Sequence, residues 1–499
     1  MIGKSIGVAL ATWGVLAATT ATAQVVPTMA GPVAGSTAGT VSAFKGIPYA
    51  AAPVGANRWR APQPVAPWQA PRDATHFGSD CAQAPFPPDA APIETTPSED
   101  CLYLNVWKPA AARAGARLPV MVWVHGGGFV NGGTSPTVYS GERFARDGVV
   151  FVSLNYRLGR FGFFAHPGLA AEGYGGNFGF LDQIAALKWV RANVAAFGGD
   201  PARVTVFGES AGGMSMHMLL QSPLARGLYN QVIIESGGGR DTALPMPTIA
   251  AAARIGRAFA PDASAAELRA LPAARVTGDL SMSTMGQPGY SGPMVDGQTI
   301  LGSGYDAASA GLDARVPVMI GANSADGFPA GPDKAKVWAS FGSDAERARA
   351  TYDPQGTADG LQVAAAASAD RMMIEPSRAV ARALAPRQPV YFYRFAYGQG
   401  KFRDMLGGAP HATEIPYAFA TVDWRHDPKM IPAEAPVAAL MHRYWIDFAK
   451  TGRPDGDGAP AWPATTASDD TVQVIDAAGA RHELDPYKAR LDFAASLAK

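Results

Sequence analysis

Short apolar segments recur along the chain, and stretches with helical periodicity lie between them. Residues 25–50 alternate small, glycine and valine residues, as short antiparallel strands with tight turns do. Further strand-like segments span residues 102–107, 119–124, 149–155, 204–207, 232–234, 316–320, 390–395 and 472–475. Several are apolar at every position, which is typical of strands buried on both faces. Strands that alternate with helices predict a mostly parallel sheet with right-handed crossovers.

The clearest helical pattern covers residues 181–197 and ends at Gly198-Gly199. Two other intervals, near residues 242–292 and 329–387, contain few strand-like segments and are rich in Ala, Arg and Glu. They are predicted to be helical insertions, which often form lids and substrate pockets. No internal repeat or low-complexity linker divides the chain, so we expect one domain over residues 24–499.

The first 23 residues have the pattern of a signal peptide. Lys4 precedes an apolar run over residues 6–18, and Ala21-Thr22-Ala23 provides the small-x-small site that signal peptidase cleaves. The apolar run is shorter than the roughly 20 residues that a membrane span needs, although an uncleaved anchor is the alternative. We expect a mature chain from Gln24, secreted or periplasmic.

Export from the cytosol allows the redox state of the two cysteines to be predicted. Cys81 and Cys101 form the one available pair, and an oxidising compartment favours a disulfide between them. Closing a loop of this length would stabilise the fold by about 3 kcal/mol. Two buried free thiols are the alternative.

Charge restricts the class of partner. Lys plus Arg and Asp plus Glu each number 42, so the formal net charge is zero, and no basic tract stands out. This argues against nucleic acid or an anionic membrane surface as the main partner and favours a neutral or apolar small molecule. The sequence carries no signal for the oligomeric state.

The strongest chemical signal is the segment GESAGG at residues 208–213, directly after the strand-like residues 204–207. A G-x-S-x-G turn exposes its serine at a strained corner between a strand and a helix. The pattern alone has little weight, because residues 3–7 (GKSIG) also match it inside the predicted signal peptide. The preceding strand and the following helix distinguish Ser210 as the candidate nucleophile.

A second glycine-rich segment, HGGGF at residues 125–129, also follows a predicted strand. Acyl transfer requires stabilisation of an oxyanion, and backbone N–H groups provide it without side-chain reorganisation. The N–H groups of Gly127, Gly128 and Ala211 would form such a hole. A plain glycine-rich turn is the alternative.

The general base is sought among the late histidines, because this arrangement has the chain order serine, acid, histidine. His442 lies in a helical pattern, and His482 follows the last strand on a polar stretch, while His426 is a further candidate. His411 lies in a glycine-rich loop beyond residues 390–395 and is preferred.

For the acid, Asp326 directly follows the strand-like residues 316–320 and would fix the imidazole tautomer. Asp296 and Glu375 are substitutes, but neither follows so clear a strand.

Taken together, these segments resemble the type-B carboxylesterase family, which includes the cholinesterases and bacterial p-nitrobenzyl esterases. The resemblance extends over most of the mature chain and is carried by residues 44–50 (FKGIPYA), 99–106 (EDCLYLNV), 155–159 (NYRLG), 179–183 (GFLDQ) and 411–417 (HATEIPY). It implies an α/β-hydrolase fold, the Cys81–Cys101 disulfide, and structural ion pairs Arg58–Glu99 and Arg157–Asp182. Glu209, Ser215 and Ser236 resemble family positions near the site, although a structural role explains each of them equally well.

Two departures from the family pattern matter. The family usually has glutamate where this chain has Asp326, so the acid is one methylene shorter, and either the loop approaches more closely or a water intervenes. The residues between Cys81 and Cys101 include no Trp or Tyr, only Phe86. Because quaternary ammonium groups bind best against Trp, choline esters are not expected to be the preferred substrates.

The sequence therefore predicts a serine esterase that hydrolyses small-molecule carboxylic esters through an acyl-enzyme, with no metal or organic cofactor. The rivals are a non-catalytic binding protein on the same scaffold, an amidase and a lipase. The first would have lost the serine or the histidine, and a lipase would need a large apolar lid. No motif identifies the acyl or alcohol group.

Overall fold

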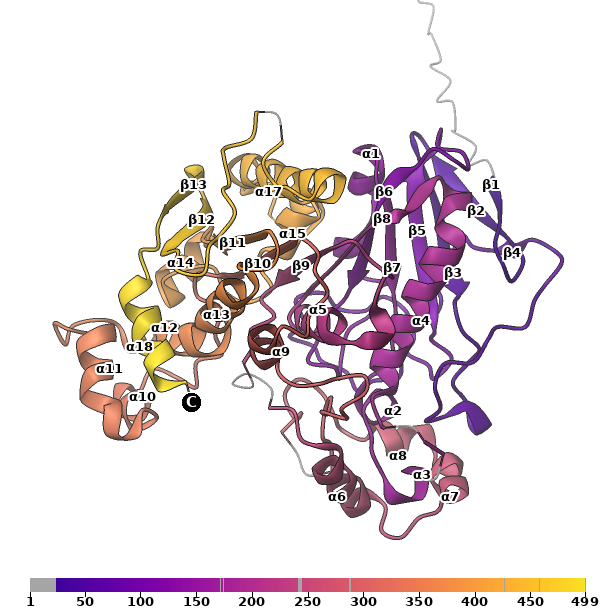
Figure 1. Ribbon diagram of the computed structural model, residues 1–499, viewed down its shortest axis with the longest axis horizontal. Helices are drawn as coiled ribbons and strands as arrows, with labels where there is room; N and C mark the ends of the chain where they lie inside the picture. Colours follow the sequence, from indigo (N-terminus) through magenta and orange to yellow (C-terminus); the bar gives the residue numbers. More distant parts are fainter. Residues whose placement is uncertain are drawn as a thin grey trace, which may run out of the picture.

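The computed structural model describes residues 24–170, 172–173, 175–240, 245–286, 289–425, 427–456 and 458–498. The predicted signal peptide lies outside the described residues. The described chain contains a thirteen-stranded sheet with the order β1-β2-β3-β5-β7-β6-β8-β9-β10-β11-β12-β13, in which β4 pairs with β2 (Figure 1). The strands are β1 (Gln24–Pro27), β2 (Pro32–Ala38), β3 (Val41–Pro48), β4 (Arg72–Asp73), β5 (Tyr103–Pro109), β6 (Leu118–Val124), β7 (Val150–Leu154), β8 (Gly199–Glu209), β9 (Gln231–Glu235), β10 (Val318–Asn323), β11 (Val390–Phe395), β12 (Thr471–Asp476) and β13 (Gly479–Leu484).

The middle of the sheet is parallel and its margins are antiparallel. Parallel pairing runs continuously from β7 through β6, β8, β9, β10 and β11 to β12. The pairs from β1 through β2, β3 and β5 to β7 and the final hairpin β12–β13 are antiparallel, whereas the short strand β4 pairs with β2 in parallel. The predicted mostly parallel α/β sheet is therefore confirmed, and each of the strand-like segments overlaps a strand.

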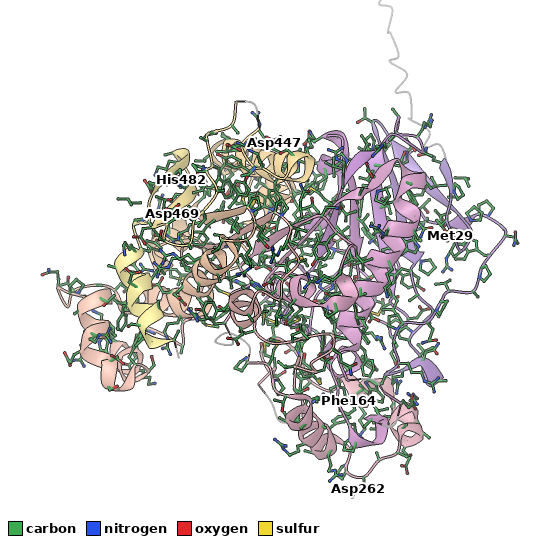
Figure 2. All side chains as sticks on the ribbon, in the orientation of Figure 1. Met29, Phe164, Asp262, Asp447, Asp469 and His482 are labelled. Atoms are coloured by element: carbon green, nitrogen blue, oxygen red, sulfur yellow. A yellow bond between two sulfur atoms is a disulfide. The ribbon has the colours of Figure 1, made fainter. Side chains whose placement is uncertain are left out.

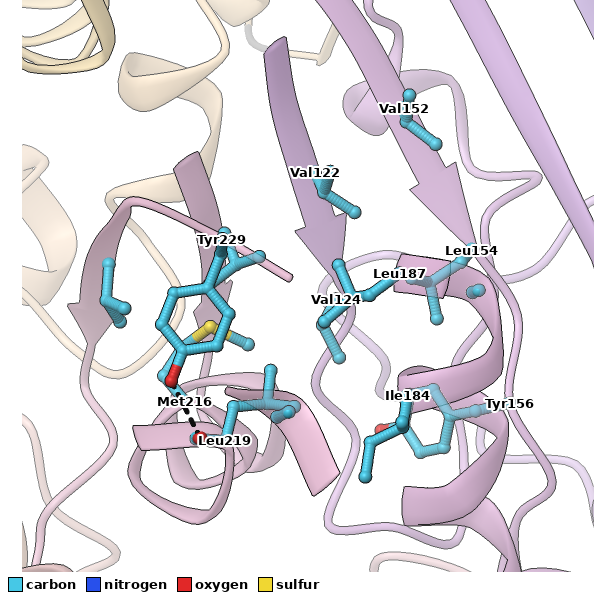
Figure 3. Close-up of a cluster of buried hydrophobic side chains, with 14 of the residues drawn as sticks. Val122, Val124, Val152, Leu154, Tyr156, Ile184, Leu187, Met216, Leu219 and Tyr229 are labelled. Atoms are coloured by element: carbon cyan, nitrogen blue, oxygen red, sulfur yellow. Dashed lines mark hydrogen bonds between the residues drawn. The ribbon is translucent and has the colours of Figure 1, made fainter. Parts of the chain in front are cut away.

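Strand β6 shows why its sequence is apolar throughout. Val120, Val122 and Val124 belong to one hydrophobic cluster, whereas Met121 and Trp123 between them belong to another. Successive side chains of a strand point to opposite faces, so both faces of β6 are covered. Figure 3 shows the first cluster, in which side chains of α4 and α5 pack against β6 and β7.

Helices cover both faces of the sheet (Figure 1). Helix α4 is followed by a 3₁₀ turn and by Gly198 at φ 90°, so the predicted stop at this glycine is confirmed. The helices are α1 (Glu142–Arg146), α2 (Gly159–Gly162), α3 (Pro167–Ala170), α4 (Phe178–Asn193), α5 (Ala211–Gln221), α6 (Ile249–Phe259), α7 (Ala265–Ala270), α8 (Ala273–Thr277), α9 (Gly304–Ala310), α10 (Lys334–Ala339), α11 (Ala345–Tyr352), α12 (Gly360–Ala369), α13 (Glu375–Leu384), α14 (Gly400–Leu406), α15 (Ile415–Ala418), α16 (Val422–Arg425), α17 (Ile431–Thr451) and α18 (Lys488–Leu497).

Two groups of these helices project from the sheet. Helices α6 to α8 lie in the first interval that lacked strand patterns, and α10 to α13 lie in the second. In Figure 1, α6 to α8 extend below the sheet, while α10 and α11 extend to the side away from β1 and β2. A π-helical turn, Asp370–Ile374, connects α12 to α13.

The covalent and ionic links expected from the resemblance are present. Cys81 and Cys101 form a disulfide. Arg58 and Glu99 form a two-bond ion pair with N–O distances of 2.8 and 2.5 Å. Arg157 and Asp182 form another at 2.7 Å for both bonds, with 3% and 0% of the two side chains exposed.

We expect Asp182→Asn to lower the free energy of unfolding by about 3–5 kcal/mol, because the substitution leaves the Arg157 charge buried without its counter-ion. Urea unfolding followed by tryptophan fluorescence measures this loss. The matched control is Glu142→Gln, which breaks the exposed pair between Glu142 and Arg146 in α1 and should change the value by less than about 0.5 kcal/mol. Equal losses in the two variants would contradict the expectation.

Candidate active site

Ser210 occupies a sharp corner between β8 and α5. Its backbone angles are φ 57° and ψ −121°, a conformation that side-chain-bearing residues rarely adopt. The corner is held by a hydrogen bond from the Ser210 N–H to the carbonyl of Glu235 at 3.0 Å. A strained serine between a strand and a helix is the geometry expected of an exposed nucleophile.

The glycines around Ser210 are required by close backbone packing. A Cβ atom on Gly208 would lie 2.6 Å from the carbonyl oxygen of Val124, and one on Gly212 would clash with the same oxygen. A Cβ on Gly213 would lie 2.5 Å from the carbonyl oxygen of Glu235. These glycines let α5 begin directly against the neighbouring strands.

The glycine-rich segment after β6 curls toward the same point. Gly127 and Gly128 have φ angles of 94° and 61°, which favour glycine. Among the described residues, neither of their N–H groups is bonded to an acceptor. Gly128, Ser210 and Ala211 line one cavity of about 310 Å³. Two of the three predicted oxyanion donors, Gly128 and Ala211, therefore border the space beside Ser210, and Gly127 directly precedes Gly128 in the chain.

His125 fixes the start of this glycine-rich segment. Its ring stacks on Tyr156 with centroids 4.5 Å apart, and the Tyr156 hydroxyl donates to the His125 carbonyl at 3.0 Å. Burial lowers the pKa of His125 to about 4, so the ring is neutral at physiological pH. The neutral ring of His125, stacked on Tyr156, therefore holds the start of the glycine-rich segment in place.

His411 and Asp326 are in direct contact. Nδ1 of His411 lies 2.6 Å from Oδ1 of Asp326, whose side chain is fully buried. The other oxygen of Asp326 accepts hydrogen bonds from the Asn323 N–H at 2.8 Å and the Ser236 hydroxyl at 2.6 Å. Three donors thus hold the carboxylate, and no bridging water is needed despite the shorter side chain.

Two hydrogen bonds bring the Asp326 and His411 loops together. The Ala325 N–H donates to the Ala409 carbonyl at 2.9 Å, and the Ala409 N–H donates to the Ser324 hydroxyl at 2.9 Å. These bonds join the segment after β10 to the segment that carries His411. They explain how the short side chain of an aspartate reaches the imidazole.

The second imidazole nitrogen of His411 lies beside the residue that precedes Ser210. Nε2 is 3.2 Å from Oε1 of Glu209, and the described residues offer neither atom a hydrogen bond of good geometry. Glu209 is almost completely buried. Asp326 thus orients the ring on one side, and on the other side the ring lies beside Glu209, the residue that precedes Ser210.

The carboxyl groups around His411 change its acidity. Burial lowers the pKa of His411, but the charges of Glu209 and Asp326 outweigh burial and raise this pKa to about 10. Burial raises the pKa of Glu209 well above its usual range. The two groups therefore compete for one proton, and the imidazole is a base when Glu209 holds that proton.

Glu414 was not identified as a site residue from the sequence. It is fully buried, its carboxylate accepts from the Asn323 side chain, and burial raises its pKa to about 7. Ser236 lies between it and Asp326, with its hydroxyl 3.4 Å from the Glu414 carboxylate. In the sequence, the one signal for Glu414 was its position three residues after His411 in the segment HATEIPY.

The alternative site residues lie elsewhere or have other partners. His442 lies in α17 between the Ala418 carbonyl and Asp147, and His482 lies on β13 at the margin of the sheet (Figure 2). His426 lies outside the described residues. Asp296 accepts hydrogen bonds from Asn177 and from the turn that follows it, and Glu375 is paired with Arg240.

Methionines form most of the wall of the Ser210 cavity. Met214, Met282, Met285, Met372 and Met373 line it together with Phe328. Methionine is flexible and polarisable, so it packs against apolar groups of varied shape. The space beside Ser210 is suited to an apolar group.

Comparison with known proteins identifies the family to which the chain belongs. The profile of the family described as "Carboxylesterase family" matches residues 22–336 and 346–494. The chain belongs to the carboxylesterase family. It is 37% identical over 468 residues to a para-nitrobenzyl esterase of Bacillus subtilis (strain 168), covering 89% of this chain and 93% of that protein.

Other relatives include a fumonisin B1 esterase of Sphingopyxis macrogoltabida, which is 36% identical and matches 85% of this carboxylesterase and 82% of its own length. A solved PNB esterase structure superposes with a TM-score of 0.81 at 33% identity, covering 94% of this chain and 99% of that one. This carboxylesterase is a carboxylic ester hydrolase with an α/β-hydrolase fold. In the part of the chain that is described, no helix is both long and apolar enough to cross a membrane.

We expect Glu209→Gln to lower the pKa of the His411 imidazole, because the substitution removes the carboxyl group nearest Nε2. A pH titration of the protein with isotopically labelled histidine, followed by NMR, measures this pKa. Glu235→Gln is the matched control, since Glu235 is another buried carboxyl group but is bonded to Trp445 instead of facing the ring. An unchanged pKa in Glu209→Gln would contradict the expectation.

Proposed function

We propose that Ser210, His411 and Asp326 form the catalytic triad of this ester hydrolase. The single observation that carries the proposal is the 2.6 Å contact between His411 and buried Asp326, made by a ring whose other nitrogen lies beside Glu209, the residue that precedes Ser210. Asp326 fixes the tautomer in which Nδ1 carries the proton, and Nε2 is then free to act as a base.

The acylation step follows from these roles. Nε2 of His411 accepts the Ser210 proton while Oγ forms a bond to the carbonyl carbon of the ester. The carbonyl π electrons move to oxygen, and the N–H groups of Gly127, Gly128 and Ala211 bind the resulting oxyanion. When the carbonyl re-forms, the C–O bond to the alcohol breaks, and the alcohol leaves with the proton from His411.

Deacylation uses the same groups in reverse. His411 accepts a proton from water, the hydroxide forms a bond to the acyl carbon, and Ser210 leaves with that proton. Because protonated imidazole cannot accept a proton, kcat/KM should fall as the pH drops through the raised pKa of His411. Glu209→Gln should move this loss of activity to lower pH.

The cavity and the composition support a substrate class. The methionine-lined space beside Ser210 favours esters with an apolar acyl group, and the zero net charge is consistent with small-molecule substrates in place of nucleic acid. The related proteins are named for chemically different esters, so no single substrate transfers from them. No metal or organic cofactor enters any step.

The wider organisation is proposed on the same basis. Residues 24–499 form one catalytic domain with helical insertions near residues 242–292 and 329–387, and residues 1–23 are a signal peptide. The Cys81–Cys101 disulfide is compatible with an exported, secreted or periplasmic enzyme.

Ser210→Ala should lower kcat for p-nitrophenyl butyrate by about six orders of magnitude, because it removes the nucleophile. Unchanged circular dichroism and melting temperature would show that the fold is intact. Ser222→Ala, at the end of the same helix, is the control and should retain activity and labelling by a fluorophosphonate probe. Labelling or turnover retained in Ser210→Ala would refute the assignment of the nucleophile.

Asp326→Asn should lower kcat by about four orders of magnitude, because an amide favours the wrong imidazole tautomer. Asp296→Asn tests the alternative acid and should change kcat by less than tenfold, since Asp296 belongs to a turn bonded to Asn177. Steady-state kinetics with p-nitrophenyl butyrate measure both. The reverse ranking would assign the acid to Asp296.

A further inference from the structure

Two of the proposed oxyanion donors belong to consecutive peptide groups whose carbonyl oxygens both accept hydrogen bonds. The N–H of Gly127 shares a peptide group with the carbonyl of Gly126, and the N–H of Gly128 shares one with the carbonyl of Gly127. Both peptide groups are trans, so the C=O and N–H bonds of each point in opposite directions. The residues that hold each carbonyl therefore also set the direction of a donor.

The Gly127 carbonyl is held by the segment that follows it. It accepts hydrogen bonds from the N–H groups of Val130 at 3.0 Å and Asn131 at 2.9 Å. The N–H of Gly128 is thereby directed to the opposite side of the peptide group, and Gly128 lines the cavity that contains Ser210. The position of Asn131 consequently determines the orientation of one oxyanion donor.

Asn131 is buried, and its side chain fixes its position. Its Oδ1 accepts from the Met282 N–H at 2.8 Å, while its Nδ2 donates to the Ala84 carbonyl at 2.8 Å and to Oε1 of Gln83 at 3.3 Å. These bonds join three segments that are distant in the sequence, namely the loop after Cys81, the glycine-rich segment and the first helical insertion. A side chain with both a donor and an acceptor is needed to make them.

The Gly126 carbonyl is held by the imidazole of His125. Nδ1 of His125 lies 2.9 Å from this oxygen, and because a carbonyl oxygen only accepts, Nδ1 carries the proton of the neutral ring. The ring packs so closely against Gly132 that a Cβ atom there would lie 2.5 Å from Nδ1. The backbone of Gly132 is therefore the wall that keeps this imidazole in place.

Gln83 holds the backbone of Gly132 from both sides. Its Oε1 accepts from the Gly132 N–H at 2.9 Å, and its Nε2 donates to the Gly132 carbonyl at 2.7 Å. Nε2 also donates to the carbonyl of Cys81 at 3.0 Å, and the disulfide ties this loop to Cys101, close to the start of β5. Gln83 thus supports the wall against which the His125 ring rests.

We propose that Asn131 and Gln83 are positioning residues for the oxyanion hole. Asn131 orients the N–H group of Gly128 through the carbonyl that precedes it. Gln83 orients the N–H group of Gly127 through the wall that supports the imidazole. Neither side chain lines the cavity that contains Ser210, so both act through the backbone. The proposal rests on the proposed function, because it takes these N–H groups as donors to the oxyanion.

The test separates the binding of an oxyanion from the binding of a similar molecule that cannot form one. With hexyl trifluoromethyl ketone, Oγ of Ser210 forms a bond to the carbonyl carbon, the hydroxyl proton moves to His411, and the carbonyl π electrons move to oxygen. The corresponding secondary alcohol has the same chain but cannot form this oxyanion. The measured quantity is the inhibition constant of the alcohol divided by that of the ketone, a ratio that does not depend on the fraction of folded enzyme.

Asn131→Ala should lower this ratio by about 10- to 100-fold, because a displaced donor stabilises the oxyanion less well. The value of kcat/KM for p-nitrophenyl butyrate should fall by a similar factor, since the same donors act in the transition state. Gln83→Met should lower both quantities in the same way. Gln83→Glu keeps an acceptor for the Gly132 N–H and should therefore lower them less than Gln83→Met.

Asn193→Ala is the matched control. Asn193 is also buried, and its amide also joins two backbone groups, the Met29 N–H at 2.7 Å and the Trp189 carbonyl at 2.8 Å. It lies at the end of α4 that precedes β8, whereas Ser210 follows the other end of that strand. Asn193→Ala should lower the melting temperature, because it removes buried hydrogen bonds, and should leave the ratio unchanged.

The other outcomes overturn the proposal in different ways. An unchanged ratio in Asn131→Ala and Gln83→Met, with ester turnover retained, would overturn it and leave the esterase assignment standing. Equal weakening of the ketone and the alcohol would show that the two residues shape the cavity instead of the hole. A ratio lowered as much by Asn193→Ala would attribute the effect to a general loosening of the fold.

Two results keep the proposal distinct from folding and from the proposed function. If Asn131→Ala does not fold, Gln83→Met decides the question, since Gln83 is only half-buried and its replacement has a similar shape. A wild-type enzyme that hydrolyses no p-nitrophenyl butyrate and binds the ketone no more tightly than the alcohol would refute the proposed function itself.

Discussion

The parallel register between β6 and β8 determines where the reactive groups of this carboxylesterase meet. Val124 at the end of β6 pairs with Gly208 of β8, so the two strands end at the same level of the sheet. Strand β6 leads into the glycine-rich segment, and β8 leads into the corner that holds Ser210. The Val124 carbonyl lies so close to Gly208 and Gly212 that neither position tolerates a Cβ atom. A shift of one residue in this register would separate the proposed oxyanion donors from Ser210 and would also exchange the two faces of β6.

The imidazole is positioned by a second pair of neighbouring strands. The segment after β10 carries Asp326, the segment after β11 carries His411, and hydrogen bonds at Ala325 and Ala409 hold the two segments together. Burying a carboxylate is unfavourable unless donors compensate for lost water, and Asp326 has three such donors. Glu209 and Glu414 lack equivalent compensation, and burial raises their pKa values instead. Donors therefore compensate Asp326 for its burial, whereas burial favours the protonated forms of Glu209 and Glu414.

The sequence was informative where chemistry depends on neighbouring residues in the chain. The strand before Ser210, the helix after it and the three glycines of residues 126–128 follow from local patterns, so the elbow and the glycine loop could be located. The contact between His411 and Asp326 depends on hydrogen bonds between loops 85 residues apart, which no local pattern encodes. Glu414 was missed for the same reason, because its partners are Asn323 at the end of β10 and Ser236 directly after β9, which are distant in the sequence. Whether an aspartate can reach the imidazole depends on the distance between the two loops, and the hydrogen bond between Ala325 and Ala409 holds these loops close together.

The helical insertions contribute to the site in a different way from the sheet. Parallel strands hold the backbone near Ser210, whereas α10, α12 and the π-helical turn contribute residues to the walls of the neighbouring cavities. Relatives that share this sheet are named for esters as different as para-nitrobenzyl esters and fumonisin B1. Residues that line the cavity beside Ser210 but lie outside the catalytic motifs, such as Phe328 and Met372, can therefore alter the preferred ester without changing the sheet.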